Sequence, residues 1–429
     1  MFQSRRVRTW VVASVAILAT LAAVLLYVNL TAGEKRIQHQ LPRLYQTDDA
    51  EFRRSLSSLL GPQIVEGNSV ETLVNGERIF PAMLAAIRSA RHTITFETYI
   101  YWSGEIGREF VQALAERARA GVKVHVLLDW VGSMKMDAAL LEEMRSAGIE
   151  VERFHEPHWN NWAKLNNRTH RKLLVVDGAI GFTGGVGIAD QWRGDARNPQ
   201  EWRDTHFRVA GPVVAQMQSV FLDNWMRATG KVLHGEAYFP SLKPVGPYAA
   251  QMFSSSPTGG SESMQLMYLL AITAARRTID LSNSYFVPDE MTIQTLTDAA
   301  RRGVRIRVIT PNGHIDSETV RKASRGSWGP MLEAGIQIAE YAPTMYHVKG
   351  LVVDGVFSSV GSTNFDNRSF RLNDEANLNV LNAEFGRVQE QVFERDWGLA
   401  KKITLAQWQE RPLTERFWER MARLLHTQL

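Results

Sequence analysis

The chain has 429 residues, 45% of them hydrophobic and 22% charged, a composition that suits a globular protein with sizeable cores and excludes disordered or collagen-like chains. It contains no cysteine, so disulfides and thiolate metal sites are excluded. The 49 basic and 45 acidic residues leave a net charge of only +4. Because a nucleic-acid binder usually carries a larger excess or a dense basic stripe, we expect no nucleic-acid partner.

The first predicted element is an apolar helix near the N-terminus. Residues 10–30 (WVVASVAILATLAAVLLYVNL) form a run of 21 positions without a charge. At 1.5 Å per residue such a helix spans about 30 Å, the thickness of the bilayer core. Arg5, Arg6 and Arg8 precede it and should stay cytoplasmic. The segment therefore predicts a single-pass anchor in the cell (inner) membrane, with the remaining chain on the non-cytoplasmic side. A cleaved signal peptide, whose apolar region is usually about 7–15 residues, is the alternative.

After a polar linker the chain repeats itself. Residues 81–101 and 268–287 each read as an amphipathic helix followed by a β-branched strand. Residues 108–129 and 293–311 each read as a helix, a terminating glycine and an apolar strand. The offset between matching positions shrinks gradually from 185 to 177, as small loop differences between duplicated domains would produce.

Strands that alternate with helices predict an α/β fold with a mixed sheet. We expect two tandem, pseudo-symmetric lobes of this kind, each a mixed sheet flanked by helices, behind an N-terminal transmembrane helix. The boundary between the lobes is placed in a stretch rich in glycine and proline. The predicted domains are an anchor (residues 1–33), a linker (34–65), a first lobe (66–240) and a second lobe (241–429).

One pattern, His-x-Lys-x4-Asp, occurs once in each half. In a strand, residues i and i+2 point to the same face, so each histidine should project together with its lysine. The aspartate follows at an odd offset of seven and should face away, which favours a structural role for it. The candidate catalytic set formed by the two copies is His170, Lys172, Asp177, His347, Lys349 and Asp354.

These residue types suit the chemistry of phosphodiesters. A neutral imidazole can attack phosphorus and form a phosphohistidine, which divides one difficult step into two. A second imidazole can protonate the leaving oxygen and later take a proton from the acceptor. Two lysines can neutralise the non-bridging oxygens. No metal or other cofactor is required, and we expect the two copies to build one composite site.

Small residues follow each copy of the pattern. They are TGGVG at 183–187 and GSTN at 361–364. Glycine allows the backbone to approach a phosphate closely, and serine or asparagine adds hydrogen-bond donors. A simple turn would use the same residues. The candidate phosphate-binding or supporting residues are Gly185, Ser362 and Asn364.

On these motifs the chain resembles the phospholipase D superfamily and, within it, the bacterial cardiolipin synthase-like branch. The resemblance covers about residues 70–400. Besides the paired pattern, it rests on NNRTH at 166–170, GFTGG at 181–185 and WRDTH at 202–206. The family implies two similar α/β lobes with the site at their interface and a phosphohistidine intermediate.

The resemblance also implies an acidic residue downstream that holds each histidine in the correct tautomer. These acids would be Asp204, 34 positions after His170, and Glu375, 28 positions after His347. By the same resemblance His170 is the nucleophile and His347 the general acid and base, and the reverse assignment stays open. One departure is Gly187, which stands where the second half carries the family's asparagine. This departure weakens the phosphate contacts expected from the first lobe.

The resemblance thus implies a membrane-anchored phosphatidyltransferase that makes cardiolipin through a phosphohistidine. Its partners would be phospholipid substrates, with phosphatidylglycerol the first candidate, and the membrane itself. One alternative is a phospholipase D-type hydrolase, and a second, less favoured, is a metal-independent nuclease, which the near-neutral body disfavours. A non-catalytic scaffold is a third, and the intact His-Lys pairs argue against it. The sequence indicates no obligate protein partner.

Overall fold

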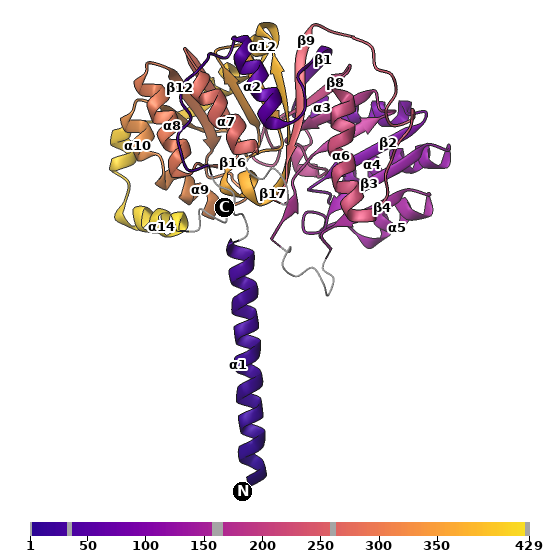
Figure 1. Cartoon of the computed structure of the whole chain (residues 1–429), viewed down its shortest axis with the longest axis vertical. Helices are drawn as coiled ribbons and strands as arrows, with labels where there is room; N and C mark the ends of the chain where they lie inside the picture. Colours follow the sequence, from indigo (N-terminus) through magenta and orange to yellow (C-terminus); the bar gives the residue numbers. More distant parts are fainter. Residues whose placement is uncertain (1, 32–36, 157–165, 258–262, 425–429) are drawn as a thin grey trace.

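The protein is described by a computed structural model that covers residues 2–31, 37–156, 166–257 and 263–424 (Figure 1). A 16-stranded mixed sheet runs through both halves of the chain, with helices packed on its faces. The predicted α/β fold with a mixed sheet is confirmed. Two helices precede the sheet, α1 (Phe2–Thr31) and α2 (Ala50–Leu60).

The first half of the sheet and its helices come from the segment between residues 65 and 229. Their bounds are β1 (Val65–Val74), α3 (Asn75–Ser89), β2 (Thr93–Thr98), α4 (Glu105–Arg119), β3 (Lys123–Asp129), α5 (Ala138–Ser146), β4 (Glu150–Phe154), β5 (Arg168–Thr169), β6 (Leu173–Val176), β7 (Ile180–Gly184), the 3-10 helix η2 (Asp190–Trp192), β8 (Thr205–Ala210) and α6 (Val214–Thr229).

The second half repeats the order of the main helices and strands, with short elements inserted among them and others added at the C-terminal end. Their bounds are β9 (Tyr248–Ser255), α7 (Ser263–Ala274), β10 (Thr278–Asn283), β11 (Phe286–Val287), α8 (Glu290–Arg301), β12 (Arg305–Pro311), α9 (Glu318–Gly326), α10 (Gly329–Glu333), β13 (Gln337–Tyr341), β14 (Lys349–Val353), β15 (Phe357–Gly361), β16 (Phe365–Asp366), α11 (Asn367–Arg371), β17 (Asn373–Leu381), α12 (Ala383–Gly398), β18 (Ala400–Ile403), α13 (Leu405–Gln409) and α14 (Leu413–Arg423).

The strand order shows the duplication directly. From the centre outward the first half reads β1-β8-β7-β6-β2-β3-β4 and the second β9-β17-β15-β14-β10-β12-β13, with β18 added at the second edge. In both halves the inner strands pair antiparallel and the outer ones parallel, except that the added β18 pairs antiparallel with β13. Gly121 and Gly303 end equivalent helices with φ of 92° and 94°, a region that favours glycine.

The two halves meet at the antiparallel pair β1–β9, so the sheet continues from one lobe into the other. Each lobe has its own buried apolar cluster. A third cluster lies at the centre and takes residues from both lobes, among them Val70 and Phe207 from the first and Leu378 and Phe385 from the second. Since sheet and core are shared, the lobes are held in one arrangement. The predicted domain bounds stay a prediction.

Helix α1 includes the whole apolar segment predicted as an anchor and projects away from the lobes (Figure 1). Among the residues that the structure describes, no helix combines the length and hydropathy needed to cross a membrane.

Candidate active site

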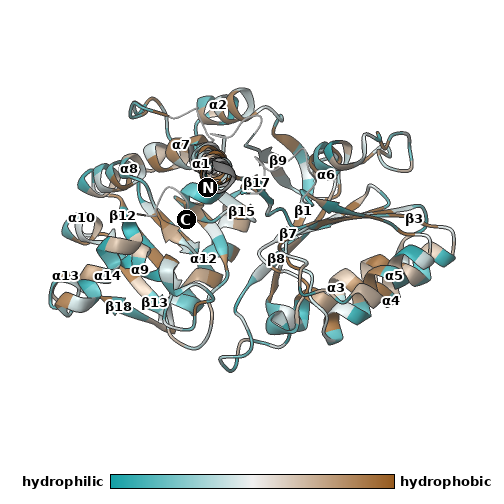
Figure 2. Ribbon diagram, turned by 90° about the horizontal axis from the view of Figure 1, so that it is seen from below, coloured by the Kyte–Doolittle hydropathy of each residue, from teal (hydrophilic) through white to brown (hydrophobic). Residues whose placement is uncertain are grey.

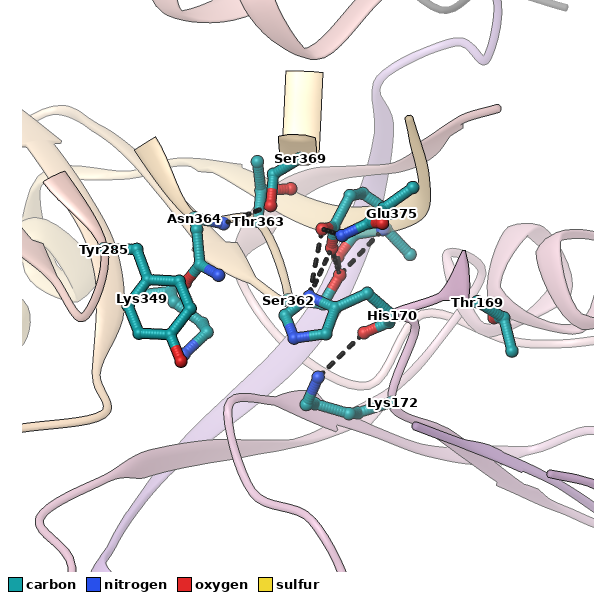
Figure 3. A network of polar contacts seen from close by, with 12 residues as sticks. Thr169, His170, Lys172, Tyr285, Lys349, Ser362, Thr363, Asn364, Ser369 and Glu375 are labelled. Atoms are coloured by element: carbon teal, nitrogen blue, oxygen red, sulfur yellow. Dashed lines mark hydrogen bonds and ion pairs between the residues drawn. The ribbon is translucent and has the colours of Figure 1, made fainter. Parts of the chain in front are cut away.

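His170 comes directly after the short strand β5, which belongs to the first lobe but pairs in parallel with β17 of the second. The His170 amide donates to the Asp374 carbonyl at 2.8 Å. The next residue of β17 is Glu375, and its two carboxylate oxygens lie 2.9 and 3.1 Å from His170 Nδ1 (Figure 3). The backbone pairing therefore delivers the carboxylate to the ring.

His347 is held in the equivalent way from the other side. Arg203, just before β8, forms a parallel bridge with Tyr346, and the His347 amide donates to the Arg203 carbonyl at 2.8 Å. The next residue is Asp204, whose Oδ2 lies 2.8 Å from His347 Nδ1. A buried ion pair between Arg203 and Asp396, at 2.8 Å, fixes this junction of the two lobes.

The pairing of histidines with acids corrects the expectation from the sequence. Asp204 was expected to hold His170 and Glu375 to hold His347, each within its own lobe. The structure crosses them, so that Glu375 holds His170 and Asp204 holds His347. The reason is that each acid stands in or beside a strand that extends across the interface and pairs with the other lobe's histidine segment.

Both acids are buried and carry further hydrogen bonds. The Ser362 hydroxyl donates to Glu375. Burial raises the pKa of Glu375, but its interactions with His170, Lys172 and Ser362 together outweigh this effect and leave the pKa below its ordinary value. Asp204 accepts from the Trp192 indole at 2.9 Å and from the Thr205 amide at 2.8 Å, and burial raises its pKa to about 6.

The protonation of the two imidazoles follows from this geometry. A carboxylate beside Nδ1 selects the tautomer with its proton on Nδ1, which leaves the Nε2 lone pair available. In Figure 3 the second ring nitrogen of His170 points away from Glu375. Burial lowers the pKa of His170 to about 4 and that of His347 well below its usual range. Both rings are therefore neutral at pH 7 before an anion binds.

Each lysine lies beside the histidine of its own motif, as the i, i+2 spacing predicts. Lys172 Nζ donates to the His170 carbonyl at 2.8 Å, and Lys349 Nζ donates to the His347 carbonyl at 2.9 Å. Lys349 also donates to Ser284 at 2.7 Å. Burial, aided by mutual repulsion at Lys172, lowers the pKa of Lys172 to about 7, and burial lowers that of Lys349 to about 8. A bound phosphate would restore full charge on both.

The two motif aspartates are placed away from the histidines. Asp177 and Asp354 occupy left-handed turn positions with φ of 50° and 55°. The Asp177 carboxylate accepts the amides of residues 91–93, and the Asp354 carboxylate accepts those of residues 276–278. Each thus closes the turn that leads into the neighbouring strand. Their inclusion among the candidate catalytic residues is wrong as to direct chemistry, because these backbone bonds occupy their carboxylates.

The small-residue turns differ between the lobes. Asn364 lines the cavity and accepts from Ser284 at 2.7 Å. A Cβ on Gly185 would lie 2.2 Å from an Asp204 oxygen, so this position must be glycine for the acid to fit. A Cβ on Gly187 would lie 2.7 Å from the Ile100 side chain, so no asparagine fits there. The first lobe therefore offers no side chain equivalent to Asn364.

A cavity of about 370 Å³ lies between the lobes at these groups. Both histidines, Lys172 and Asn364 line it. Among the other lining residues are five aromatic side chains and three cations that the sequence reasoning did not select as site residues: Tyr99, Trp102, Trp192, Trp202, Tyr285, Lys135, Arg168 and Arg368. Their positions are scattered along the chain, and only Arg168 and Trp202 fell within quoted motifs. No local pattern marks the others.

Within the described part of the chain, no group of three or more histidine, aspartate or glutamate side chains is arranged to hold a metal ion. Besides Gln191, Asp316 and Asn373, the polar side chains that line the cavity are the donors and acceptors already described. These groups can attack phosphorus, transfer a proton and neutralise an anion.

A duplicated α/β lobe with two facing His-Lys pairs in one cavity defines a class of enzyme that cleaves or transfers phosphodiesters. The chain belongs to the phospholipase D-like family of cardiolipin synthases. The family model described as "Cardiolipin synthase, PLD-like domain" matches residues 83–197 and 268–397. The predicted superfamily and branch are confirmed.

Named relatives agree with this assignment. The chain is 37% identical to the cardiolipin synthase of Geobacillus kaustophilus (strain HTA426) over 358 residues, which cover 82% of this chain and 71% of that one. It is 34% identical to cardiolipin synthase A of Pseudomonas syringae pv. syringae (strain B728a) over 373 residues, or 87% and 77% of the two chains. The phosphatidylserine synthase structure of Haemophilus influenzae Rd KW20 shares the fold, with a TM-score of 0.68, 13% identity and coverage of 88% of this chain and all of that one.

Proposed function

We propose that this protein is a phosphatidyltransferase that makes cardiolipin by passing a phosphatidyl group through a histidine. The observation that carries the proposal is the composite site itself. Two buried histidines face one cavity, each with Nδ1 bound to a carboxylate of the other lobe and each with a lysine beside it. The relatives named as cardiolipin synthases support the substrate class.

In the first step, His170 Nε2 attacks the phosphorus of a donor such as phosphatidylglycerol. The N–P bond forms while the bond from phosphorus to the headgroup oxygen breaks. His347, as imidazolium, gives its proton to the leaving glycerol oxygen. Lys172 and Lys349 neutralise the non-bridging oxygens, where negative charge is concentrated in the transition state.

In the second step, a hydroxyl of another phosphatidylglycerol attacks the phosphorus. His347 takes the proton of that hydroxyl, the N–P bond breaks, and His170 returns to its neutral state. Two molecules of phosphatidylglycerol become one cardiolipin and one glycerol. Both histidines end as they began, so the cycle is complete.

In the free enzyme both histidines have lowered pKa values, which bears differently on the two roles. A neutral His170 has the free lone pair that a nucleophile needs. His347 must carry a proton, and a phosphodiester anion bound between the lysines would favour that charged form. We therefore expect substrate binding to switch His347 into its acid form.

The test is a product assay with the purified full chain and phosphatidylglycerol. We expect cardiolipin and free glycerol in equal amounts. If phosphatidic acid is the sole lipid product, water is the acceptor and the enzyme is a hydrolase. Degradation of DNA in chelator, without any lipid product, would instead support the nuclease alternative.

We propose in addition that α1 anchors the protein in the cell (inner) membrane, with the lobes on the non-cytoplasmic side. Thirty helical residues extend for about 45 Å. Described side chains of this helix, such as Trp10, Leu18 and Leu21, are exposed and apolar. Three arginines near its start favour a cytoplasmic N-terminus.

The chain lacks cysteine, which makes the topology simple to test. Ser4→Cys lies before the apolar segment, and Val232→Cys is on an exposed loop of the lobes. An impermeant maleimide added to intact spheroplasts should label Val232→Cys and leave Ser4→Cys unlabelled. Labelling of Ser4→Cys alone, or release of the protein by alkaline carbonate, would refute the proposed anchoring.

A further inference from the structure

Two arginines from opposite lobes line the same cavity as the histidines. Arg168 stands in β5, two positions before His170, and Arg368 stands in α11. Neither takes part in the two steps above. Arg168 belongs to the NNRTH motif at 166–170, to which the proposed chemistry assigns only the histidine.

The structure brings both guanidinium groups to one stretch of backbone. Arg368 donates to the Asn166 side-chain oxygen at 2.9 Å and to the Asn166 carbonyl at 3.1 Å. Arg168 donates to the adjacent Asn167 carbonyl at 2.8 Å. The pKa of Arg368 is lowered, first by burial and then by the charge of Arg168. Two like charges thus lie close together at the wall of a cavity, an arrangement that an anion stabilises.

The charge of the cavity wall exceeds what one phosphodiester needs. Lys135, Arg168, Lys172 and Arg368 line it, and Asp316 is the one carboxylate among its described lining residues. In the proposed mechanism the two motif lysines neutralise the charge of the donor phosphate. A hydrolase would need no further anion site, because water carries no charge. A phospholipid acceptor brings a second phosphate, which needs a partner of its own.

We propose that Arg168 and Arg368 bind the phosphate of the acceptor phospholipid. This inference rests on the proposed transferase function. Guanidinium groups bind phosphate oxygens through paired hydrogen bonds, which fixes orientation as well as charge. Holding the acceptor phosphate beside His170 places its glycerol hydroxyl near the phosphorus. The pair therefore makes a phospholipid a better acceptor than free glycerol.

The experiment compares two acceptors in one reaction. The full chain in proteoliposomes receives phosphatidylglycerol and labelled free glycerol. Transfer to lipid gives cardiolipin, and transfer to glycerol gives labelled phosphatidylglycerol. Arg168→Gln and Arg368→Gln should each lower the ratio of cardiolipin to labelled phosphatidylglycerol about tenfold or more, the usual effect of losing a hydrogen bond to a charged group. The control is Arg108→Gln, on the exposed face of α4.

Arg368→Lys keeps the charge and should restore part of the ratio. An unchanged ratio, or an equal fall of both products, would overturn the acceptor site while leaving the transferase function intact. A wild-type protein that exchanges glycerol but forms no cardiolipin would still transfer phosphatidyl groups, and this result would overturn the proposed cardiolipin synthesis and the acceptor site with it.

A separate observation concerns α14, whose apolar side faces outward. Leu413, Phe417, Met421 and Leu424 are 78, 56, 44 and 68% exposed. At this spacing they form one stripe on the helix. The buried positions are Glu419 and Ala422, on the opposite side. A helix of a globular protein normally turns its apolar stripe inward, so this outward stripe implies a partner.

The buried side of α14 is held by ion pairs and by Ala422, which belongs to a small apolar cluster with Val320 and Ala323 of α9. Glu419 pairs with Arg411 at 3.1 Å and with Arg325 of α9 at 3.5 Å. Arg416, Arg420 and Arg423 are exposed along one edge of the outward stripe. In Figure 1, α14 lies at the lower side of the lobes, from which α1 extends, and Figure 2 shows it from that side.

The geometry points to α14 as a helix that lies in the surface of an anionic bilayer. Apolar side chains would enter the interface and the arginines would contact lipid phosphates. The lack of cysteine allows a single label to test this. Phe417→Cys, labelled with an environment-sensitive fluorophore in full-length protein, should shift to shorter wavelength in phosphatidylglycerol vesicles and be quenched by spin-labelled lipid. Val232→Cys, on an exposed loop, is the control and should do neither.

A label at position 417 that stays water-exposed in vesicles would overturn this proposal. So would a blue shift that appears without lipid and grows with protein concentration, because it would identify a second copy of the chain as the partner.

Discussion

The two lobes share one architecture but secure their opposite histidines by different means. Ser362, directly after β15, donates a hydroxyl hydrogen bond to Glu375. The equivalent position after β7 is Gly185, which has no side chain to donate. There the Trp192 indole donates to Asp204 instead. In both halves the acid of one lobe holds the histidine of the other, but the side chains that donate hydrogen bonds to the two acids differ.

A second difference concerns the cavity wall. Asn364 lines the cavity from the second lobe, whereas Gly187 at the equivalent position of the first packs beside Ile100. The site is thus symmetric in its backbone and asymmetric in its donors. This teaches that the two histidines have unequal surroundings, as a nucleophile and an acid–base group require.

The largest effect is expected from the histidines themselves. His170→Ala and His347→Ala should each lower kcat/KM about ten-thousandfold, because each removes a group that acts on the reacting atoms. Rapid quenching with labelled donor should detect a phosphatidyl adduct in His347→Ala and none in His170→Ala. An adduct in His170→Ala alone would reverse the assignment of nucleophile between the lobes.

The crossed acids come next. Asp204→Asn and Glu375→Gln should each reduce kcat/KM about a hundredfold to ten-thousandfold, as expected when a histidine loses its orienting carboxylate. A double-mutant cycle should show strong coupling of Asp204 with His347 and weak coupling with His170. Stronger coupling within a lobe than across the interface would contradict the crossing.

The lysines should set the alkaline side of the pH profile. Lys172 and Lys349 have pKa values lowered to about 7 and about 8, and they are cationic below those values. As pH rises from 7 to 9, the free enzyme loses the charge of both lysines, so kcat/KM should fall by up to about tenfold per pH unit at first and more steeply above about pH 8. Lys172→Arg and Lys349→Arg, measured separately, should identify which of the two lysines causes the fall of kcat/KM at alkaline pH. A profile that is flat over this range would contradict the assignment.

The local donors should have a smaller effect. Ser362→Ala and Trp192→Phe each remove one hydrogen bond to a buried carboxylate, so we expect kcat/KM to fall about tenfold. Ser358→Ala, the same change elsewhere on β15, is the matched control. If only one of the two variants loses activity, only one of the two acids depends on its side-chain hydrogen bond for activity.

The smallest effect on turnover is expected from the motif aspartates. Asp177→Asn and Asp354→Asn keep a residue that tolerates the left-handed turn but weaken three backbone hydrogen bonds. The free energy of unfolding should fall by about 1–3 kcal/mol in each, with kcat of the folded enzyme nearly unchanged. Chemical denaturation and kinetics on the same samples would check both parts.

The sequence alone determined the α/β class, the duplication and the two His-Lys pairs, because these follow from periodicity and spacing along the chain. The even offset between His170 and Lys172 and the odd offset to Asp177 also correctly predicted which side chains share a face. Such features depend on residues that lie within a few positions of one another along the chain. They are local, and local geometry can be read from the order of residues.

Only the tertiary structure decided which acid holds which histidine. Glu375 reaches His170 because β17 pairs with β5 across the lobes, and no spacing along the chain encodes that pairing. The same holds for the cavity wall, where Trp192 and Arg368 come from segments far apart in sequence. Long-range backbone pairing brings these groups together, and burial then sets their pKa values. Neither effect exists until the two lobes are folded and packed against each other.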